Sequence, residues 1–361
     1  MKKIAVIGTQ GVPAKYGGFE SLVDNIIGGN RSDDVEYTVF CSSLDLDRHL
    51  KEHKGSRLKY VPLHANGIQS IPYDVISMMR ALKGFDAMLI LGVSGCLFLP
   101  LIRLMAGKTR IAVNIDGMEH RREKWGPMAR NFLRSSEAMA VKYADVVIAD
   151  NKGIQDYVKR AYNRPSTLIT YGGDHVIRNI SEENELEILK NYGVSPKQYA
   201  MTVCRIEPEN NCHLTLEAAS RSKMPLLFIG NWGHSEYSRN LRKQYADCPT
   251  IMMRDAIYDL DVLFALRKNA GFYVHGHSAG GTNTSLVEAM FFGIPILAFD
   301  VEYNRYTTFG KAFYWKNPDQ LVDLLERSGL NGEEMATLAR ENYIWKRIAR
   351  QYEEAVLGSR R

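Results

Sequence analysis

The sequence is poor in cysteine, and none of its cysteines has the spacing of a metal or redox pair. Five occur among 361 residues, an odd number, and no Cys-x-x-Cys is present. This pattern indicates neither a disulfide framework nor a zinc site. A reducing compartment suits such a chain best, so we expect a cytoplasmic protein. The five are Cys41, Cys96, Cys204, Cys212 and Cys248.

An uninterrupted apolar run of membrane-spanning length is also missing. The most apolar stretch, Met88–Met105, is broken by glycines, a proline and an arginine, so a spanning helix is not expected. We expect a buried strand at Ala87–Leu91 and a short apolar helix at Cys96–Met105, which either belongs to the core or lies in a membrane surface. The apolar run after Met1 is too short for a signal peptide and indicates a first strand. Peripheral association with the cytoplasmic face of the inner membrane stays open.

No dense basic stripe is present, which excludes an ordinary nucleic-acid binder. The net charge of +5 is nevertheless uneven. Residues 1–175 carry 24 Lys and Arg against 18 Asp and Glu, whereas the remainder carries 22 against 23. A mildly basic first half suits an anionic substrate or an anionic membrane, and an ordinary solvated surface is the alternative.

Short apolar runs alternate with amphipathic segments of helix length along the chain, and the pattern restarts near Tyr199. Continuous apolar strands between helices predict parallel sheets covered on both faces. We therefore expect an α/β chain with two Rossmann-like doubly wound domains, 1–174 and 175–340. A final helix within 341–361 would pack back on the first domain. Ligands of such sheets bind at the carboxyl ends of the strands, so a cleft between two such edges is expected. The expected strands include Ile4–Ile7, Tyr37–Cys41, Met88–Leu91, Ile111–Ile115, Val146–Ala149, Leu168–Thr170, Ala200–Cys204, Leu226–Ile229, Ile251–Met253, Gly271–His275 and Ile296–Phe299.

The first loop of interest, Gly8–Glu20, contains four glycines and separates the first strand from a helix. Glycine lets backbone approach a ligand, and a helix N-terminus offers N–H groups to an anion, so we expect a phosphate site; a plain turn is the alternative. The spacing G-x-x-G is not that of dinucleotide-binding enzymes. No acidic residue follows the second strand either, which speaks against a dehydrogenase.

A second loop, Asn114–Trp125, gathers acidic, imidazole and basic side chains at the end of another strand. Asp116, Glu119 and His120 lie beside several cations, which puts acid, base and phosphate-pairing groups in one place. Taken singly, each is an ordinary surface charge. The cations of this loop are Arg121, Arg122 and Lys124.

Two further loops follow strands of the second half. Arg205 leaves a buried strand, where a guanidinium can bind a diphosphate and stabilise a departing one; a surface pair with Glu207 or Glu209 is the alternative. The segment His275–Glu288 runs from a strand through a glycine loop into a helix that Asn283 or Thr284 would cap. Its carboxylate could accept hydrogen bonds from sugar hydroxyls or pair with a neighbouring base. Its histidines have no third ligand at a spacing that supports a metal site.

Together these segments resemble family 4 retaining glycosyltransferases of the GT-B fold. More narrowly, they resemble the bacterial rhamnosyltransferases of capsule and cell-wall polysaccharides. The resemblance spans nearly the whole chain. It rests on Gly8-Thr-Gln-Gly-Val-Pro-Ala-Lys-Tyr-Gly-Gly-Phe-Glu20, Asp116-Gly-Met-Glu119, Arg205-Ile-Glu-Pro-Glu-Asn-Asn211, and His275-Gly-His-Ser-Ala-Gly-Gly-Thr-Asn283 through Glu288-Ala-Met290.

The resemblance implies roles for individual residues. Arg205 would bind the donor diphosphate, the backbone of Gly281–Asn283 would contact diphosphate and sugar, and Glu288 would hold the nucleoside sugar. The implied catalytic residues are Asp116, Glu119 and Arg205. The implied donor-binding residues are Gly11, Lys15, Gly17, Gly18, Arg205, Asn210, His275, Gly280, Gly281, Thr282, Asn283 and Glu288. The implied acceptor-side residues are His120, Arg121, Arg122, Lys124 and Trp125.

The sequence departs from the wider family at three positions. Asn210 stands where many members have lysine, and Gly280 replaces the first of two glutamates. The subgroup shares both losses, which leave less fixed positive charge for the diphosphate unless Lys15, Arg121 or Arg122 supplies it. His120 replaces an expected tryptophan, which bears on the choice of acceptor.

The implied activity is transfer of L-rhamnose from dTDP-rhamnose to a saccharide on a polyprenyl diphosphate. No metal or other cofactor is expected. The alternatives are a transferase with a UDP-sugar donor, a sugar-nucleotide epimerase of the same fold and a non-enzymatic regulator that binds a sugar or a nucleotide.

Overall fold

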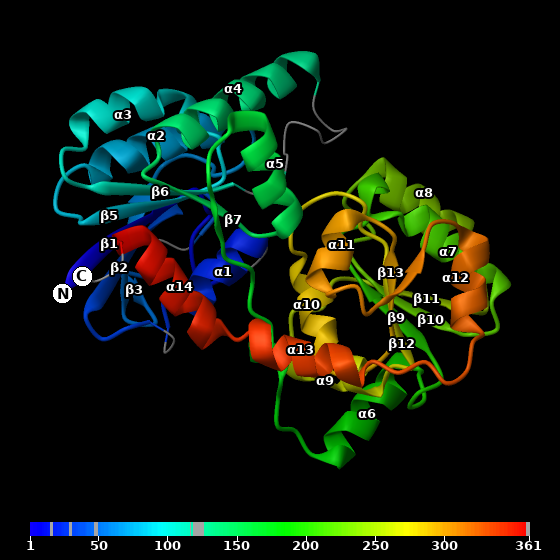
Figure 1. The fold of residues 1–361 in the computed structure, drawn as a ribbon. Helices are drawn as coiled ribbons and strands as arrows, with labels where there is room; N and C mark the ends of the chain where they lie inside the picture. Colours follow the sequence, from blue (N-terminus) through cyan, green and yellow to red (C-terminus); the bar gives the residue numbers. More distant parts are fainter. Residues whose placement is uncertain (15–16, 29–30, 47–49, 116, 118–125, 359–361) are drawn as a thin grey trace. The chain divides into compact units, whose positions relative to one another are not determined.

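The computed structural model describes residues 1–14, 17–28, 31–46, 50–115, 117 and 126–358. The chain folds into two compact units, and it passes from one to the other twice. Unit 1 consists of Met1–Tyr171 and Trp345–Arg361, and unit 2 of Gly172–Ile344. Each unit is built on its own sheet, as Figure 1 shows.

Unit 1 contains an eight-stranded sheet in the order β3-β4-β2-β1-β5-β6-β7-β8. Among the described strands of this sheet, only β3 pairs antiparallel, with β4. The four central strands are almost wholly buried, which explains why their sequences are continuous apolar runs. The strands are β1 (Lys2–Ile7), β2 (Val35–Ser42), β3 (Glu52–His53), β4 (Ser56–Val61), β5 (Ala87–Leu91), β6 (Arg110–Ile115), β7 (Val146–Ala149) and β8 (Thr167–Leu168).

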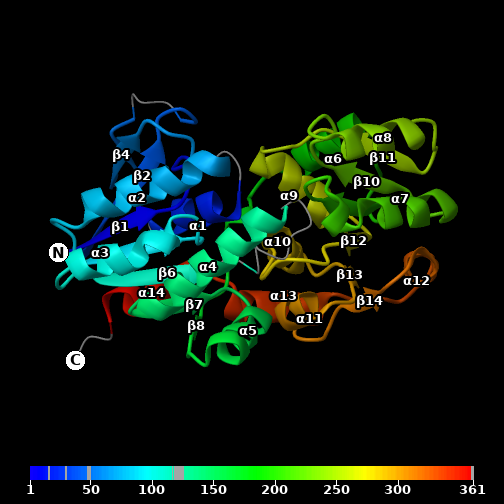
Figure 2. The same ribbon diagram turned by 90° about the horizontal axis from the view of Figure 1, so that it is seen from above.

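Helices cover both faces of this sheet. In Figures 1 and 2, α2, α3 and α4 lie on one face, and α1 and α14 lie on the other. The helices are α1 (Gly18–Ile26), α2 (Ser70–Ala81), α3 (Leu99–Met105), α4 (Pro127–Tyr143), α5 (Lys152–Tyr162) and α14 (Trp345–Leu357), with 3₁₀ turns η1 (Gly67–Gln69) and η2 (Cys96–Phe98).

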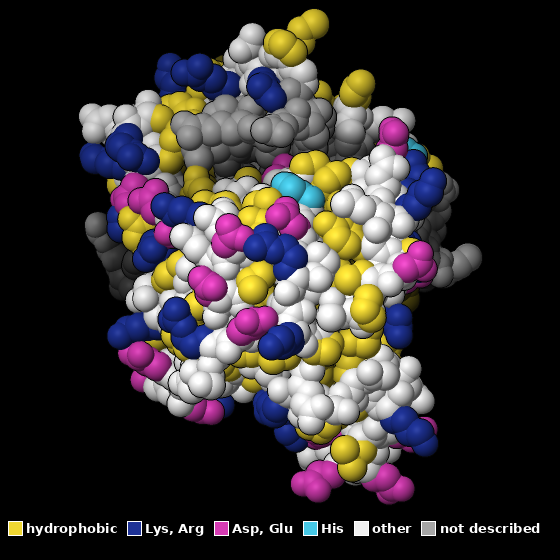
Figure 3. Space-filling model, turned by 90° about the vertical axis from the view of Figure 1, so that its right-hand side faces the viewer, with side chains coloured by type: hydrophobic (Ala, Val, Ile, Leu, Met, Phe, Trp, Pro, Cys, Tyr) yellow, Lys and Arg dark blue, Asp and Glu magenta, His cyan; other side chains and the backbone are white. Residues whose placement is uncertain are grey.

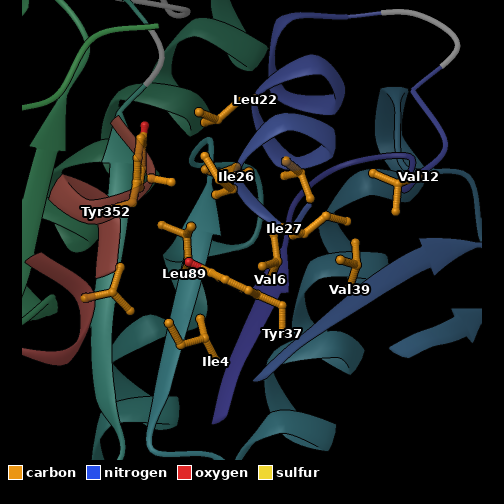
Figure 4. Close-up of a cluster of buried hydrophobic side chains, with 14 of the residues drawn as sticks. Ile4, Val6, Val12, Leu22, Ile26, Ile27, Tyr37, Val39, Leu89 and Tyr352 are labelled. Carbon is orange, nitrogen blue, oxygen red and sulfur yellow. The ribbon is translucent and has the colours of Figure 1, made fainter. Parts of the chain in front are cut away.

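The C-terminal helix α14 is part of the unit 1 core. Its buried side chains join those of α1, β1 and β2 in one apolar cluster, part of which Figure 4 shows. Tyr352 lies in this cluster, and its hydroxyl accepts a hydrogen bond from Asn114 Nδ2 on β6 at 2.6 Å. The last segment of the chain therefore helps to hold together the unit in which the chain begins.

Unit 2 contains a six-stranded parallel sheet in the order β11-β10-β9-β12-β13-β14. The strands are β9 (Ala200–Val203), β10 (Leu226–Ile229), β11 (Ile251–Arg254), β12 (Phe272–His275), β13 (Ile296–Phe299) and β14 (Phe313–Trp315). The helices are α6 (Glu182–Tyr192), α7 (Cys212–Arg221), α8 (Glu236–Gln244), α9 (Leu260–Asn269), α10 (Thr284–Met290), α11 (Glu302–Thr307), α12 (Pro318–Leu325) and α13 (Glu333–Asn342), with 3₁₀ turns η4 (Asp174–Val176) and η5 (Pro208–Asn210).

The two predicted parallel sheets are confirmed, and some boundaries are corrected. Strand pairing ends at Leu168, so the predicted strand Leu168–Thr170 is wrong in its bounds. The final helix expected within 341–361 begins at Trp345, because the backbone leaves helical geometry at Tyr343 (φ −115°, ψ 40°). No described helix is both long and apolar enough to cross a membrane.

Gly8, directly after β1, is required by packing. Its φ is +96°, and a Cβ there would lie 2.1 Å from the Leu91 carbonyl oxygen. Gly84 has a similar φ of +85° but no atom within 4 Å of its Cβ position. A substitution at Gly84 therefore tests backbone strain alone, whereas a substitution at Gly8 tests strain together with a steric clash.

We expect Gly84→Ala to lower the free energy of unfolding of unit 1 by about 1–2 kcal/mol, the cost of a left-handed backbone. Gly8→Ala should cost roughly 1–3 kcal/mol more, because the added methyl overpacks the sheet. Urea unfolding of each variant, monitored by hydrogen exchange of the β1 amides, measures both losses in the free energy of unfolding. Equal losses would show that the close approach to Leu91 is not a constraint.

Candidate functional site

Two of the predicted loops lie side by side in unit 2. The loop after β9 and the loop after β12 leave neighbouring strands at the same sheet edge. The N–H and Oγ–H of Ser278 both donate to the Glu209 carbonyl, at 2.9 and 2.8 Å. The Asn211 amide donates to the Gly276 carbonyl at 2.9 Å. The arginine segment and the glycine segment, which were predicted separately, therefore form one structure.

Gly276 permits this close approach. A Cβ at this position would lie 2.4 Å from the Asn210 carbonyl oxygen and 3.3 Å from Thr215 Oγ1. The first distance is far below contact, and a backbone oxygen cannot rotate away. Glycine is thus needed here for loop-to-loop packing, independently of any ligand.

Arg205 is exposed immediately beyond β9, at the carboxyl edge of the sheet. Asn210 is buried, and its side chain donates to the Arg205 carbonyl at 2.8 Å. The Cys212 thiol lies 3.7 Å from the same carbonyl and 3.8 Å from Cys204 Sγ. Asn210 therefore holds the backbone of the arginine loop. A direct contact of Asn210 with a donor remains a prediction.

The turn into α10 is built as predicted at its cap. Asn283 Oδ1 accepts from the Ser285 N–H at 3.2 Å, so Asn283 rather than Thr284 is the N-cap. Thr282 is buried, and Gly281 is partly exposed. Gly280 has a φ of +115° with no atom within 4 Å of its Cβ position, so space is open beside it.

Glu288 is paired with a buried base, which was the alternative interpretation of this residue. Its Oε2 lies 2.5 Å from Arg267 Nη2, and its Oε1 lies 3.5 Å from His175 Nε2. The Arg267 side chain is 2% exposed. Burial alone would raise the pKa of Glu288, but the Arg267 guanidinium and His175 outweigh it and hold that pKa below its usual value. A further role for this carboxylate in donor binding stays a prediction.

His275 and His277 stack on each other with ring centroids 4.3 Å apart. Burial lowers the pKa of the His275 imidazole to about 3, so this ring is neutral at physiological pH. Its Nε2 is buried and has no hydrogen-bond partner in the part of the chain that the structure describes. Among the described residues, no cluster of three or more His, Cys, Asp or Glu side chains could hold a metal ion.

The glycine loop of unit 1 is shaped by the protein itself. Gly11 is buried with a φ of +114°, and a Cβ there would lie 2.4 Å from Cys41 Sγ. The Gln10 N–H donates to Glu20 Oε1 at 2.8 Å, so the start of α1 supports the loop. Gly17 is exposed and Gly18 partly so. The need for glycine at position 11 is therefore explained by packing, and it is not evidence for a ligand.

Several predicted residues lie outside the described part of the chain. They are Lys15, Asp116, Glu119, His120, Arg121, Arg122, Lys124 and Trp125. The predicted acid–base loop and the predicted acceptor side therefore remain predictions from sequence.

The sequence reasoning missed three buried polar groups. Arg267 follows the apolar run Leu263–Leu266, and a charge in such a run is a signal that could have been used. Asn304 donates to the His277 and Phe299 carbonyls, both at 2.9 Å, and no pattern in the neighbouring sequence indicates this role. In unit 1, burial raises the pKa of Asp74 to about 7; its carboxylate accepts from the Gly95 N–H at 3.1 Å.

We expect Gly276→Ala to separate the two loops of unit 2. The added methyl should cost about 1–3 kcal/mol of stability and displace Arg205 relative to Gly280. Gly233→Ala is the matched control, because the atom nearest to its Cβ position is Asn231 Oδ1 at 3.8 Å. Amide chemical shifts of the two loops give the displacement. Unchanged shifts in Gly276→Ala would contradict the packing argument.

Glu288→Gln should leave the buried Arg267 charge uncompensated, at a cost of about 3–5 kcal/mol. Because the folded pKa of Glu288 lies below its reference value of 4.5, its contribution is present above that pH and is lost as the pH falls further. The difference from the wild type should therefore shrink in acid. Glu334→Gln, which breaks the exposed pair with Lys311, should cost about 0–1 kcal/mol. Urea titrations across pH test both, and a pH-independent difference would exclude the ion pair as the cause.

Comparison with known proteins gives a match to a family model over part of the chain and a fold for nearly all of it. Residues 1–174 match the family described as "Domain of unknown function (DUF1972)". The curated proteins contain no match to the chain.

Solved structures resemble the chain over nearly its full length. Sucrose-phosphate synthase from Thermosynechococcus elongatus aligns with a TM-score of 0.82 and 14% identity, covering 98% of each chain. HepE from Anabaena, in complex with UDP, aligns with a TM-score of 0.75 and 14% identity, covering 98% of this chain and 99% of its own. TarM aligns less fully, with a TM-score of 0.58 and 14% identity over 80% of this chain and 59% of its own. The predicted fold class, α/β with two Rossmann-like parallel-sheet domains of the GT-B type, is thereby confirmed.

Proposed function

We propose that this chain is a nucleotide-sugar-dependent glycosyltransferase. The observation that carries the proposal is at one sheet edge of unit 2. There the loop after β9, which contains Arg205, is hydrogen-bonded to the loop after β12, which contains Gly280. Ligands of open α/β sheets bind at such edges. Here an exposed guanidinium lies on a loop tied to one that has open space at Gly280. A diphosphate needs both a cation and room for its oxygens.

For the donor we propose dTDP-rhamnose, on the resemblance to bacterial rhamnosyltransferases of family 4. A UDP-sugar is the second candidate, and a specific observation favours it: the similar HepE structures hold UDP and UDP-glucose. Glu288 would accept hydrogen bonds from the nucleoside sugar while keeping its ion pair with Arg267, because each carboxylate oxygen has two lone pairs. The backbone around Gly281 and Thr282 would contact the phosphates.

The reaction we propose is a retaining, metal-independent transfer. The bond between the sugar C1 and the diphosphate oxygen breaks, and the electron pair leaves with the diphosphate. Arg205 stabilises the charge that develops on this leaving group. The acceptor hydroxyl oxygen bonds to C1 from the same face, and its proton passes to a phosphate oxygen. Asp116 and Glu119 are proposed to lie beside the reacting sugar.

We propose a lipid-linked acceptor, a saccharide on a polyprenyl diphosphate used in surface polysaccharide synthesis. His120, Arg121, Arg122, Lys124 and Trp125 form the proposed acceptor side. Such an acceptor lies in a membrane, so a cytoplasmic enzyme would have to meet it at the membrane surface. The support for this assignment is the resemblance of the sequence motifs.

Arg205→Ala should lower kcat about 10²–10³-fold, because it removes a charge that acts on the departing diphosphate. Arg221→Ala is the control. Arg221 lies in the last turn of α7, next to Asp319, and helices of parallel sheets return to the opposite sheet edge. The assay combines purified protein, dTDP-rhamnose or UDP-sugars, and a synthetic lipid diphosphate saccharide.

Full turnover by Arg205→Ala would exclude the proposed site. Conversion of a nucleotide sugar without any acceptor would instead identify an epimerase. Donor binding with no turnover across acceptors would identify a non-enzymatic binder. Transfer from UDP-sugars alone would correct the donor and leave the class of reaction intact.

A further inference from the structure

Helix α3 in unit 1, with Phe98 directly before it, has apolar side chains on two sides, and Arg103 is its one charged residue. Leu99 and Ile102 are buried against the unit. The opposite side exposes four large apolar side chains, at spacings of three and four residues. A helix that is apolar on both sides has a second apolar environment to meet. The exposed side chains are Phe98 at 43%, Leu101 at 57%, Leu104 at 84% and Met105 at 49%; we call them the α3 face.

The neighbouring helices extend this surface. In Figures 1 and 2, α2, α3 and α4 lie next to one another on the same side of the unit 1 sheet. Met79 on α2 is 52% exposed, and Met128 in the first turn of α4 is 88% exposed. Isolated exposed apolar residues are ordinary, but several on three adjoining helices are not.

The charge around the α3 face is almost entirely of one sign. The described residues between 67 and 145 include eight Lys and Arg but four Asp and Glu. Two of the acids, Asp74 and Glu137, are buried, Asp86 is bound by Lys2, and Asp145 is bound by Arg103. By contrast, basic and acidic side chains are interspersed over the face shown in Figure 3. The exposed cations are Arg80, Lys83, Lys108, Arg130, Arg134 and Lys142.

We propose that the α3 face docks on an anionic lipid bilayer. Its apolar side chains would enter the boundary between headgroups and acyl chains, and the surrounding cations would contact lipid phosphates. This mode needs no spanning helix. A second copy of the chain fits less well, because two such faces would bring like charges together. The proposal goes beyond the proposed function, since it concerns a surface and not the transfer site.

The test uses the full protein and sedimentation with lipid vesicles. One set contains phosphatidylcholine alone, and the other has about one lipid in three replaced by phosphatidylglycerol. The wild type should bind the anionic vesicles and lose most binding at high salt. Each basic side chain at the surface is expected to contribute about fivefold to the partition coefficient, so Lys83→Gln/Lys108→Gln should bind about 25-fold more weakly.

Leu101→Ser/Leu104→Ser should lower the partition coefficient at least about tenfold, because it removes apolar surface that would be buried in the bilayer. Both side chains are exposed, so their replacement leaves the core intact. Ile177→Ser/Leu186→Ser is the matched control in unit 2, where the two residues are 48% and 58% exposed. It should bind like the wild type. Circular dichroism shows whether each variant is folded.

Three results would overturn the proposal. The first is wild-type binding that is no stronger on anionic than on neutral vesicles. The second is unchanged vesicle binding by Leu101→Ser/Leu104→Ser. The third is a dimer in solution that this variant abolishes while vesicle binding is absent. The vesicles contain neither donor nor acceptor, so failure here is distinguishable from failure of the proposed glycosyl transfer.

Discussion

The close approach of two loops at Gly276 is the constraint on which the site in unit 2 depends. Parallel pairing brings β9 and β12 together, but it does not determine how their following loops meet. That contact needs a position without a side chain, since any Cβ would collide with the Asn210 carbonyl. Ser278 and Asn211 then bond the two loops through backbone carbonyls. Arg205 is therefore carried by a braced loop, which is what orientation of a ligand requires.

The electrostatics of this edge follow from burial. Arg267 is the more enclosed guanidinium, yet its charge is taken up by Glu288. His275 stays neutral because its ring is buried, so it contributes hydrogen-bonding capacity and no charge. Within the segments 204–211 and 276–283, Arg205 is the single arginine or lysine. These two segments would therefore offer an anion one cation, Arg205, together with backbone N–H groups.

Much of the fold could be predicted because the central strands are buried on both faces and read as apolar runs. The strands that were missed are those that break this rule. β4 alternates as Ser-Arg-Leu-Lys-Tyr-Val, and β14 has three residues at a sheet edge. The positions of the loops after β9 and β12 could be predicted because parallel strands place the loops that follow them at one edge of the sheet. The Arg267–Glu288 pair joins the last turn of α9 to α10, and no local pattern encodes such a tertiary contact.

The glycines show that residue type alone does not distinguish a packing requirement from a ligand site. Gly8, Gly11 and Gly276 are required because protein atoms occupy the position of their Cβ. Gly280 differs, since its φ of +115° favours glycine while the space beside it is open. A glutamate there, as in the wider family, would need a strained backbone or a different turn. The loss of that carboxylate is thus tied to the shape of this loop, and it leaves room where a sugar phosphate is proposed to bind.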